Sequence, residues 1–285
     1  MAGKTFSPLR YPGGKNKLSN YVSKLILSNK LDGCTYIEPY TGGGAVAIKL
    51  LFNSIVDNIV INDYDKSIYA LWYSILNYTD ELCSLILSTE INMENWHIQK
   101  NIQKNKEDSD LLTLGFSTLF LNRTNISGII KAGVIGGLNQ TGNYKMDCRF
   151  NKKDIIDKII KIASQRKNIQ LYNLDTLSLI ENVIPNIKHK KFIFFDPPYY
   201  KKGASLYVNY YTHNDHIKLK NSIENIKNTY WIITYDNEKE IENIYKEFRQ
   251  KKYNLTYTAQ KKYLAKEIMI YSDNLVISKL LKNIF

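Results

Sequence analysis

The side chains best suited to chemistry stand in the run Asp196-Pro197-Pro198-Tyr199. The apolar residues 191–195 before it predict a buried strand, and the prolines end that strand because they lack a backbone N–H and fix φ. Open α/β sheets place their reactive groups in such loops, at the carboxyl ends of strands. A carboxylate, unused carbonyls and a flat aromatic ring suit a planar ligand that carries an amino group. The alternative, a turn that only ends the strand, stays open on this motif alone.

A glycine-containing turn lies near the start of the chain. Residues 11–15 read Tyr-Pro-Gly-Gly-Lys and precede an amphipathic helix that we predict at residues 18–27. Either Tyr11 and Lys15 meet an aromatic or anionic ligand there, or the turn simply begins the helix. A phosphate-binding P-loop is disfavoured, because Asn16 stands where that motif needs Ser or Thr.

A second glycine stretch has the form of a nucleotide-type site. Residues 35–51 predict a strand, a loop of sequence Thr-Gly-Gly-Gly and a helix. In such a unit the backbone can approach a ligand closely. The candidate ligand contacts of this unit are Glu38, Pro39, Tyr40, Gly42 and Gly44.

Carboxylates follow two further predicted strands. Asp63 ends the strand at residues 59–62 and lies about 20 residues beyond the glycine loop, where an acid accepts hydrogen bonds from ribose hydroxyls. Asp65 is a rival for that role, but its position better suits the cap of the next helix. Asp175 follows the strand at residues 169–174 and is a candidate acceptor for a purine amino group.

The strand–helix alternation breaks between residues 78 and 167. We predict a helix at residues 81–104, a more apolar helix at 111–121, hairpins or long loops at 127–142, and a helix at 154–164. The order of an α/β sheet then resumes. Residues 231–235 predict a fifth strand, and residues 255–259 and 266–271 predict a closing hairpin.

The broken region carries much of the positive charge. Residues 111–167 contain ten basic and three acidic residues, or +7 of the formal net charge of +12. This concentration favours a nucleic-acid partner over a generally lysine-rich surface. The polar and basic residues that we expect to face it are Asn122, Arg123, Asn125, Lys131, Asn139, Gln140, Lys145 and Arg149, together with Lys201 and Lys202 beside the Asp196 loop.

Composition excludes several classes of protein. The chain of 285 residues is long enough for one large domain with an insertion. Three widely spaced cysteines without a CxxC pair fit a reducing cytoplasm, and no apolar stretch is long enough to span a membrane. His213 and His216 lack companion ligands, so we expect no metal site.

Taken in order, the motifs resemble a known family. Residues 11–15, 38–44, Asn62-Asp63, Asn122-Arg123 and Asp196-Pro-Pro-Tyr199 are similar to the motifs of Dam-like, adenine-specific DNA methyltransferases, which use S-adenosylmethionine (AdoMet). The resemblance implies an α/β fold, with a Rossmann-like seven-stranded mixed sheet and an inserted helical or hairpin target-recognition domain. The expected parts are residues 1–77 for AdoMet binding, 78–167 for DNA recognition and 168–285 for catalysis.

The resemblance also implies roles for individual residues. The catalytic set would be Asp196, Pro197, Pro198 and Tyr199. The amino group of a flipped-out adenine would donate to Asp196 and the Pro197 carbonyl, with Tyr199 stacked on the ring. AdoMet would meet Tyr11, Lys15, Glu38, Pro39, Tyr40, Gly42, Gly44, Asp63, Asp175 and Asp196.

The implied partners are double-stranded DNA, AdoMet and, in a restriction-modification system, a cognate endonuclease. A phage or orphan methylation role and a monomeric or weakly dimeric enzyme are equally compatible with the motifs. Three other functions share these motifs: an RNA adenine methyltransferase, a protein or small-molecule amino-methyltransferase, and a non-catalytic DNA-binding module that keeps the fold. The second is disfavoured, because neither of its substrates needs the positively charged insertion.

Overall fold

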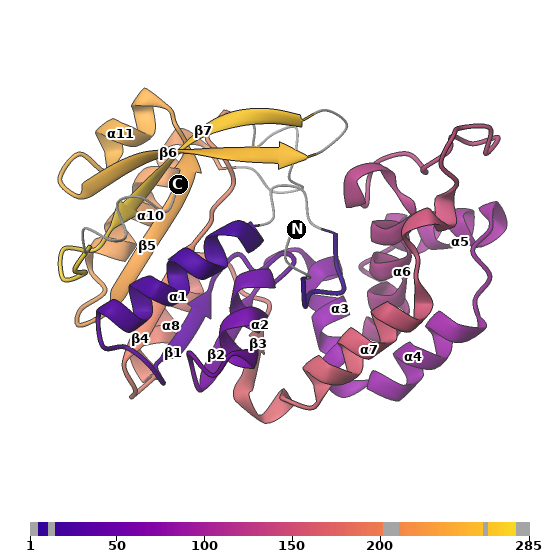
Figure 1. The fold of residues 1–285 in the computed structure, drawn as a ribbon, viewed down its shortest axis with the longest axis horizontal. Coiled ribbons are helices and arrows are strands. Elements are labelled where there is room, and N and C mark those ends of the chain that lie inside the picture. The colour runs from indigo at the N-terminus through magenta and orange to yellow at the C-terminus, as the bar shows by residue number, and fades with distance from the viewer. Residues whose placement is uncertain (1–4, 11–14, 202–210, 259–261, 278–285) are drawn as a thin grey trace.

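The apolar strand segments of this chain must be covered on both faces. The helices that connect them provide this cover, which is the arrangement of a parallel sheet. A computed structural model describes residues 5–10, 15–201, 211–258 and 262–277. Seven strands form one sheet in the order β3-β2-β1-β4-β5-β7-β6 (Figure 1). The strands are β1 (Thr35–Glu38), β2 (Asn58–Asn62), β3 (Ile169–Tyr172), β4 (Lys191–Phe195), β5 (Tyr230–Asp236), β6 (Arg249–Thr258) and β7 (Lys262–Tyr271).

Strand direction gives the sheet its mixed character. β1 to β5 are parallel, and β7 runs antiparallel between β5 and β6. The chain winds outwards in opposite directions from β1 and β4, so the loops after these two strands meet at the switch point of the sheet. The predicted seven-stranded mixed sheet is thus confirmed. β6 begins at Arg249, earlier than the predicted residue 255. The prediction missed residues 249–254 because they are mostly polar and lack the alternation of a half-buried strand.

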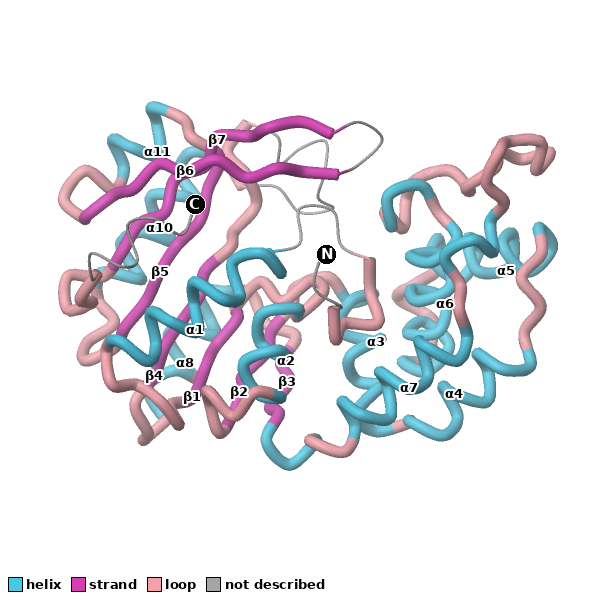
Figure 2. Tube along the Cα trace, in the orientation of Figure 1, coloured by secondary structure: helices cyan, strands magenta, loops and turns pink. Residues whose placement is uncertain are grey.

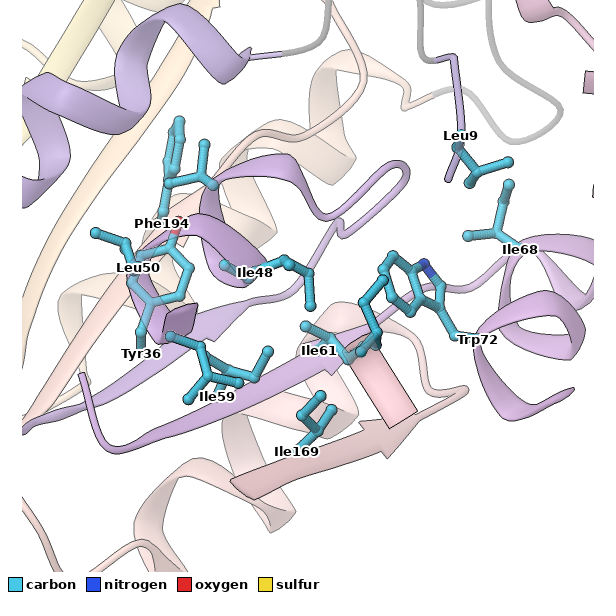
Figure 3. Close-up of a cluster of buried hydrophobic side chains, with 14 of the residues drawn as sticks. Leu9, Tyr36, Ile48, Leu50, Ile59, Ile61, Ile68, Trp72, Ile169 and Phe194 are labelled. Atoms are coloured by element: carbon cyan, nitrogen blue, oxygen red, sulfur yellow. The ribbon is translucent and has the colours of Figure 1, made fainter. Parts of the chain in front are cut away.

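Alternate strand residues enter two separate cores. Ile59 and Ile61 of β2 pack with α1 (Ser19–Ser28), α2 (Ala45–Phe52) and α3 (Lys66–Asn77), and Figure 3 shows Ile61 next to Trp72 of α3. Val60, between them, belongs to the core of the other face. That face is covered by α8 (Thr176–Asn182), α10 (His213–Glu224) and α11 (Lys239–Ile244).

The region between α3 and β3 is a group of helices that lies beside the sheet, next to α3 (Figures 1 and 2). It contains α4 (Thr79–Ser88), α5 (Met93–Lys104), α6 (Leu111–Thr124) and α7 (Lys152–Ala163), with short 3-10 turns at Ile126–Gly128 and Met146–Arg149. The division of the chain at residues 78 and 167 stays a prediction.

One expectation for this region was wrong, and for another the structure decides between two alternatives. The single helix predicted at residues 81–104 is two helices, because Asn92 leaves helical geometry and its side chain accepts from the N–H of Asn95 to cap α5. Residues 127–142, predicted as hairpins or long loops, form turns and a loop with one isolated bridge, between Asn125 and Val134. Five of these sixteen residues are glycines, which lower the strand propensity of the segment.

Other expectations concern the chain's environment. Within the described ranges, no helix is long and apolar enough to cross a membrane. Cys34, Cys83 and Cys148 are all free thiols.

Helix α6 is the centre of the inserted helices. All its residues from Leu114 to Thr124 are buried, as expected for a helix packed on every side. Gly115 allows α6 to approach α3 closely, since a Cβ at this position would lie 2.6 Å from the carbonyl oxygen of Ala70 and still closer to the Ser74 hydroxyl. The inserted helices are therefore seated on the sheet domain by a contact that leaves no room for a methyl group.

We expect Gly115→Ala to lower the free energy of unfolding by about 1–3 kcal/mol, because the helix pair must separate to admit the methyl. Gly133→Ala is the matched control, since a Cβ there meets nothing within 4 Å, and it should change stability by less than about 0.5 kcal/mol. Urea unfolding of both variants measures the difference. Equal stabilities would show that α3 and α6 are not closely packed in solution.

Candidate active site

The Asp196 loop is held from behind by β5. Thr234 donates its hydroxyl to Asp196 Oδ1 at 2.6 Å. Two residues further along the same face, Asp236 accepts the backbone N–H groups of Tyr200 at 2.9 Å and Lys201 at 3.2 Å. The two prolines have no N–H group to donate, so the hydrogen bonds of Thr234 and Asp236 hold the loop on either side of them.

A buried ionic network holds the other end of the loop. Lys15 Nζ lies 3.1 Å from Glu267 Oε2 and 3.4 Å from Asp196 Oδ1, and it donates to the Tyr199 hydroxyl at 2.9 Å. The Tyr199 hydroxyl in turn donates to Glu267 Oε1 at 2.6 Å, and that of Tyr253 donates to Glu267 Oε2 at 2.5 Å. The network joins the beginning of the chain, the Asp196 loop and the β6–β7 hairpin.

The electrostatics of Asp196 reflect a balance. Burial raises the pKa of this carboxyl, while the Lys15 ammonium and the Thr234 hydroxyl lower it and the Glu267 charge raises it again. Within the described part of the chain, the contacts of Asp196 are made by Oδ1. Oδ2 is therefore available to accept a hydrogen bond from an amino group.

The glycine loop between β1 and α2 depends on left-handed backbone. Gly42 and Gly44 have φ of 47° and 58°, and a Cβ on Gly44 would lie 2.7 Å from the Trp72 ring. Trp72 fixes the loop further by donating its indole N–H to the Gly42 carbonyl at 3.0 Å. The loop thus exposes backbone where a side chain has no room.

Asp63 closes the glycine loop from β2. Its Oδ2 accepts the Gly42 N–H at 2.8 Å, and its Oδ1 accepts the Asp65 N–H at 3.0 Å. Burial and the Asp65 charge raise the pKa of Asp63 to about 7. Asp65 caps α3 by accepting from the Ser67 N–H, as predicted.

Asn62, just before Asp63, ties three strand ends together. Its amide nitrogen donates to the carbonyls of Pro39 and Leu174, and its amide oxygen accepts the Leu174 N–H. The loops after β1 and β3 are therefore joined through one fully buried side chain.

Glu38 is a buried carboxyl beneath the glycine loop. It accepts from the Tyr36 hydroxyl at 2.7 Å and from the Ala47 N–H at 3.2 Å. Burial raises its pKa to about 8, and the nearby Asp196 charge contributes to the rise. Three carboxyls with raised pKa values, Glu38, Asp63 and Asp196, thus stand at the carboxyl ends of the adjacent strands β1, β2 and β4.

The other predicted ligand contacts take no part in the hydrogen bonds around Gly42 or Lys15 that are described above. Asp175 caps α8, its side chain accepting from the N–H groups of Leu177 and Ser178. The hydroxyl of Tyr40 lies 2.9 Å from that of Tyr211, while Pro197 and Pro198 are buried. Tyr11 lies outside the described residues.

Three of the residues expected to face DNA are instead internal supports, which corrects that expectation. Asn122 accepts from the Arg10 N–H and donates to the carbonyls of Arg10 and Gly128. Asn125 accepts from the Trp96 indole and donates to two loop carbonyls, and the buried Arg123 donates to the carbonyls of Pro8 and Arg149. Their donors bind the protein's own backbone, so in this conformation they do not face a base.

The remaining expected residues stay near the surface. Lys131, Asn139, Lys145 and Arg149 have exposed side chains, whereas Gln140 is half-buried and holds its own loop by binding Ile135, Gly137 and Met146. Lys201 is exposed and forms an ion pair with Glu238. Lys202 lies outside the described residues.

Several basic residues counted in the +7 charge serve the protein itself. Lys152 of α7 donates to the Leu87 and Thr89 carbonyls. Lys161 lies over the rings of Phe6 and Phe52, at 4.8 and 4.6 Å from their centroids. The charge total of the insertion therefore overstates the positive surface offered to a partner.

Sequence reasoning missed the residues that support the Asp196 loop. Thr234 and Asp236 stand at the end of a predicted strand, where their polarity was a usable signal. Glu267 stands alone before the apolar run 268–271, and a lone acid at a strand start is not unusual. Its importance emerges only from the pairing of β7 with β5, which sets Glu267 opposite Asp236.

Residues 11–259 match the D12 class N6 adenine-specific DNA methyltransferase family, a span that includes the glycine loop, Asp63 and the Asp196 loop. The chain belongs to this family. It is an N6-adenine-specific DNA methyltransferase, and its loop of Asp196, Pro197, Pro198 and Tyr199 lies at the switch point of the sheet.

Curated relatives of this methyltransferase are named type II methyltransferases. M.MjaIII of Methanocaldococcus jannaschii is 26% identical over 204 residues, 67% of this chain and 68% of its own length. M.CviBI of Paramecium bursaria Chlorella virus NC1A is 25% identical and covers 77% of this chain and 79% of its own. M1.LlaDCHI of Lactococcus lactis subsp. cremoris is 20% identical, with 87% of each chain covered.

Among solved structures, the rRNA methyltransferase aviRa from Streptomyces viridochromogenes aligns with 93% of this chain and 88% of its own, at 10% identity and a TM-score of 0.40. At this score the likeness carries no argument about substrate.

We expect Glu38→Gln to stabilise the methyltransferase at alkaline pH. Glu38 is protonated in the folded state up to about pH 8 but ionises near its ordinary pKa when unfolded. Its contribution to stability is therefore lost as the pH rises from about 4 to 8, and glutamine avoids this loss while keeping the acceptor for Tyr36 and Ala47. The gain, on the order of a few kcal/mol above pH 8, should vanish near pH 4. Urea unfolding across pH measures it, and a difference independent of pH would contradict the raised pKa.

Proposed function

We propose that this DNA methyltransferase takes its methyl group from AdoMet bound between the glycine loop and Asp196. The observation that carries the proposal is geometric: Glu38, Asp63 and Asp196 stand at the carboxyl ends of the adjacent strands β1, β2 and β4, and Asp63 binds the glycine loop at the Gly42 N–H. The pKa values of these three carboxyls are also raised. Acidic groups in this state are stabilised by a ligand that brings positive charge and hydroxyl donors. AdoMet carries both, and its sulfonium supplies an electrophilic methyl group.

Each part of the site has a proposed task toward AdoMet. Asp63 accepts from the ribose hydroxyls, and the left-handed backbone of Gly42 and Gly44 forms a side-chain-free loop that the ligand approaches closely. Asp175 contributes at the adenine end of the ligand. Lys15 acts beside Asp196, while Tyr11, Glu38, Pro39 and Tyr40 complete the surroundings of the ligand.

The Asp196 loop holds the target adenine in this proposal. Oδ2 of Asp196 and the Pro197 carbonyl accept from the exocyclic amino group, which directs the nitrogen lone pair toward the methyl group. Tyr199 stacks on the ring, and its hydroxyl is already fixed by Lys15 and Glu267. The loop lies at the carboxyl end of the central strand β4, and Pro197, Pro198 and Tyr199 are buried. The adenine must therefore leave the double helix to reach it.

The inserted helices at residues 78–167 form the DNA-recognition part. Support comes from the exposed side chains of the loop between Gly133 and Arg149, where Leu138 and Tyr144 are 66% and 69% exposed beside Lys145 and Arg149. Internal bonds of Gln140 make this loop a defined surface. The names of the relatives support a restriction-modification role with a cognate endonuclease.

The direct test of this function is methyl transfer from tritiated AdoMet to DNA, with digestion of the product to nucleosides. We expect label in N6-methyladenine, and we expect Asp196→Ala to lower turnover by at least about a hundredfold while DNA binding is retained. Label in duplex RNA but not in DNA would favour the RNA alternative. Substantial turnover by Asp196→Ala would remove Asp196 from the proposed mechanism.

A second prediction tests the DNA surface. Arg149→Gln should weaken DNA binding and reduce the slope of log affinity against log salt by about 1, as expected when one phosphate contact is lost. Lys153→Gln is the control, because Lys153 lies on α7 and pairs with Asp157. Fluorescence anisotropy at several salt concentrations gives both slopes. An unchanged slope for Arg149→Gln would place the DNA on another surface.

A further inference from the structure

Glu267 occupies an unusual position for a carboxylate. It lies on β7, directly opposite Asp236 of β5, and its side chain is 1% exposed. Among the described residues, the side chains of Lys15, Tyr199 and Tyr253 donate to it. A buried carboxyl with these donors is held in one position.

Lys15 is shared between two carboxylates. Its Nζ lies 3.1 and 3.3 Å from the oxygens of Glu267 and 3.4 Å from Asp196 Oδ1, so Glu267 is the nearer partner. A lysine that pairs fully with Asp196 would neutralise the group that must accept from the adenine amine. Glu267 draws the ammonium away from Asp196 while keeping it within reach of the Tyr199 hydroxyl.

We propose that Glu267 is a positioning residue for methyl transfer, which sets the Lys15 ammonium between itself and Asp196 and fixes the ring of Tyr199 through its hydroxyl. The inference rests on the proposed role of Asp196 as the acceptor for the target amine. Glu267 itself touches neither the adenine nor the methyl donor.

Two consequences follow for the Asp196 loop. With Glu267 in place, Asp196 keeps its capacity to accept from the amine, and the plane of Tyr199 is fixed at the hydroxyl end as well as at the backbone. Without the charge on Glu267, Lys15 closes on Asp196, and the Tyr199 ring loses its ionic acceptor.

The charge on Asp196 responds to groups from every element around it. Loss of the Glu267 charge removes a repulsion and strengthens the pairing with Lys15, and both changes lower the pKa of Asp196. The acidic limb of the rate profile, which reports the ionisation of Asp196, then moves to lower pH. The titratable and polar groups that face this centre are Lys15, Glu38, Tyr36, Tyr199, Thr234, Asp236, Tyr253 and Glu267.

The test compares Glu267→Gln with the full chain, using tritiated AdoMet and DNA over a range of pH. Glutamine keeps the size of the side chain and one acceptor. We expect kcat at neutral pH to fall by about ten- to a hundredfold, since a displaced group near the reacting atoms has this effect, and the acidic limb to move to lower pH. Glu224→Gln is the matched control, because Glu224 forms a surface pair with Lys220 on α10 and should leave both readouts unchanged.

A double variant guards against a purely structural effect. If Glu267 acts through Lys15, then Lys15→Met/Glu267→Gln loses no more activity than Lys15→Met alone. It also melts at a higher temperature than Glu267→Gln, because the buried ammonium that has only one carboxylate left to pair with is gone. The melting comparison and AdoMet binding by calorimetry remain informative where a single variant folds poorly.

Clear outcomes would overturn the proposal. An unchanged kcat in Glu267→Gln, a reduced kcat with an unmoved acidic limb, or additive effects in the double variant each remove the positioning role. Asp196→Ala separates this failure from that of the mechanism, since an active Asp196→Ala contradicts the proposed function itself. An inactive Asp196→Ala with a normal Glu267→Gln contradicts only the inference about Glu267.

Discussion

The proposed active centre depends on polar side chains of β5 and β7 that contact the loop after β4. Thr234, Asp236 and Glu267 each accept from or donate to a different part of that loop. Thr234 and Asp236 belong to the last three residues of β5, and Glu267 stands opposite Asp236 on β7. All three residues are buried, so each polar atom needs a partner. The Asp196 loop supplies those partners, and its rigidity is the result of satisfying buried groups on both sides.

The first residues of the described chain join the sheet to the inserted helices. Arg123 and Asn122 of α6 hold the backbone of Pro8 and Arg10, while Lys15 enters the buried network at Asp196 and Glu267. Only four residues of the sequence separate Arg10 from Lys15. A short segment is thus fixed at one end by the insertion and at the other by the active centre.

Much of this architecture could be predicted from sequence, for reasons that differ between elements. Strand runs such as residues 231–235 and the glycine loop carry local signals, and Asp63 follows from its distance to that loop. Asn122, Asn125 and Arg123 were misjudged because amide and guanidinium groups suit backbone carbonyls as well as base edges, and only the burial of α6 decides between them. Glu267 could not be found, because its partners are distant in sequence and strand register brings them together.

The place of β7 in the sheet has a consequence for synthesis. Glu267 is 252 residues beyond Lys15 and 68 beyond Tyr199, so the ribosome makes both partners long before it makes the strand that unites them. β1 to β5 can pair as they emerge, whereas β6 has its partner only when β7 pairs with both β5 and β6. A growing polypeptide therefore carries the Asp196 loop and Lys15 before it has the strand that supplies Glu267.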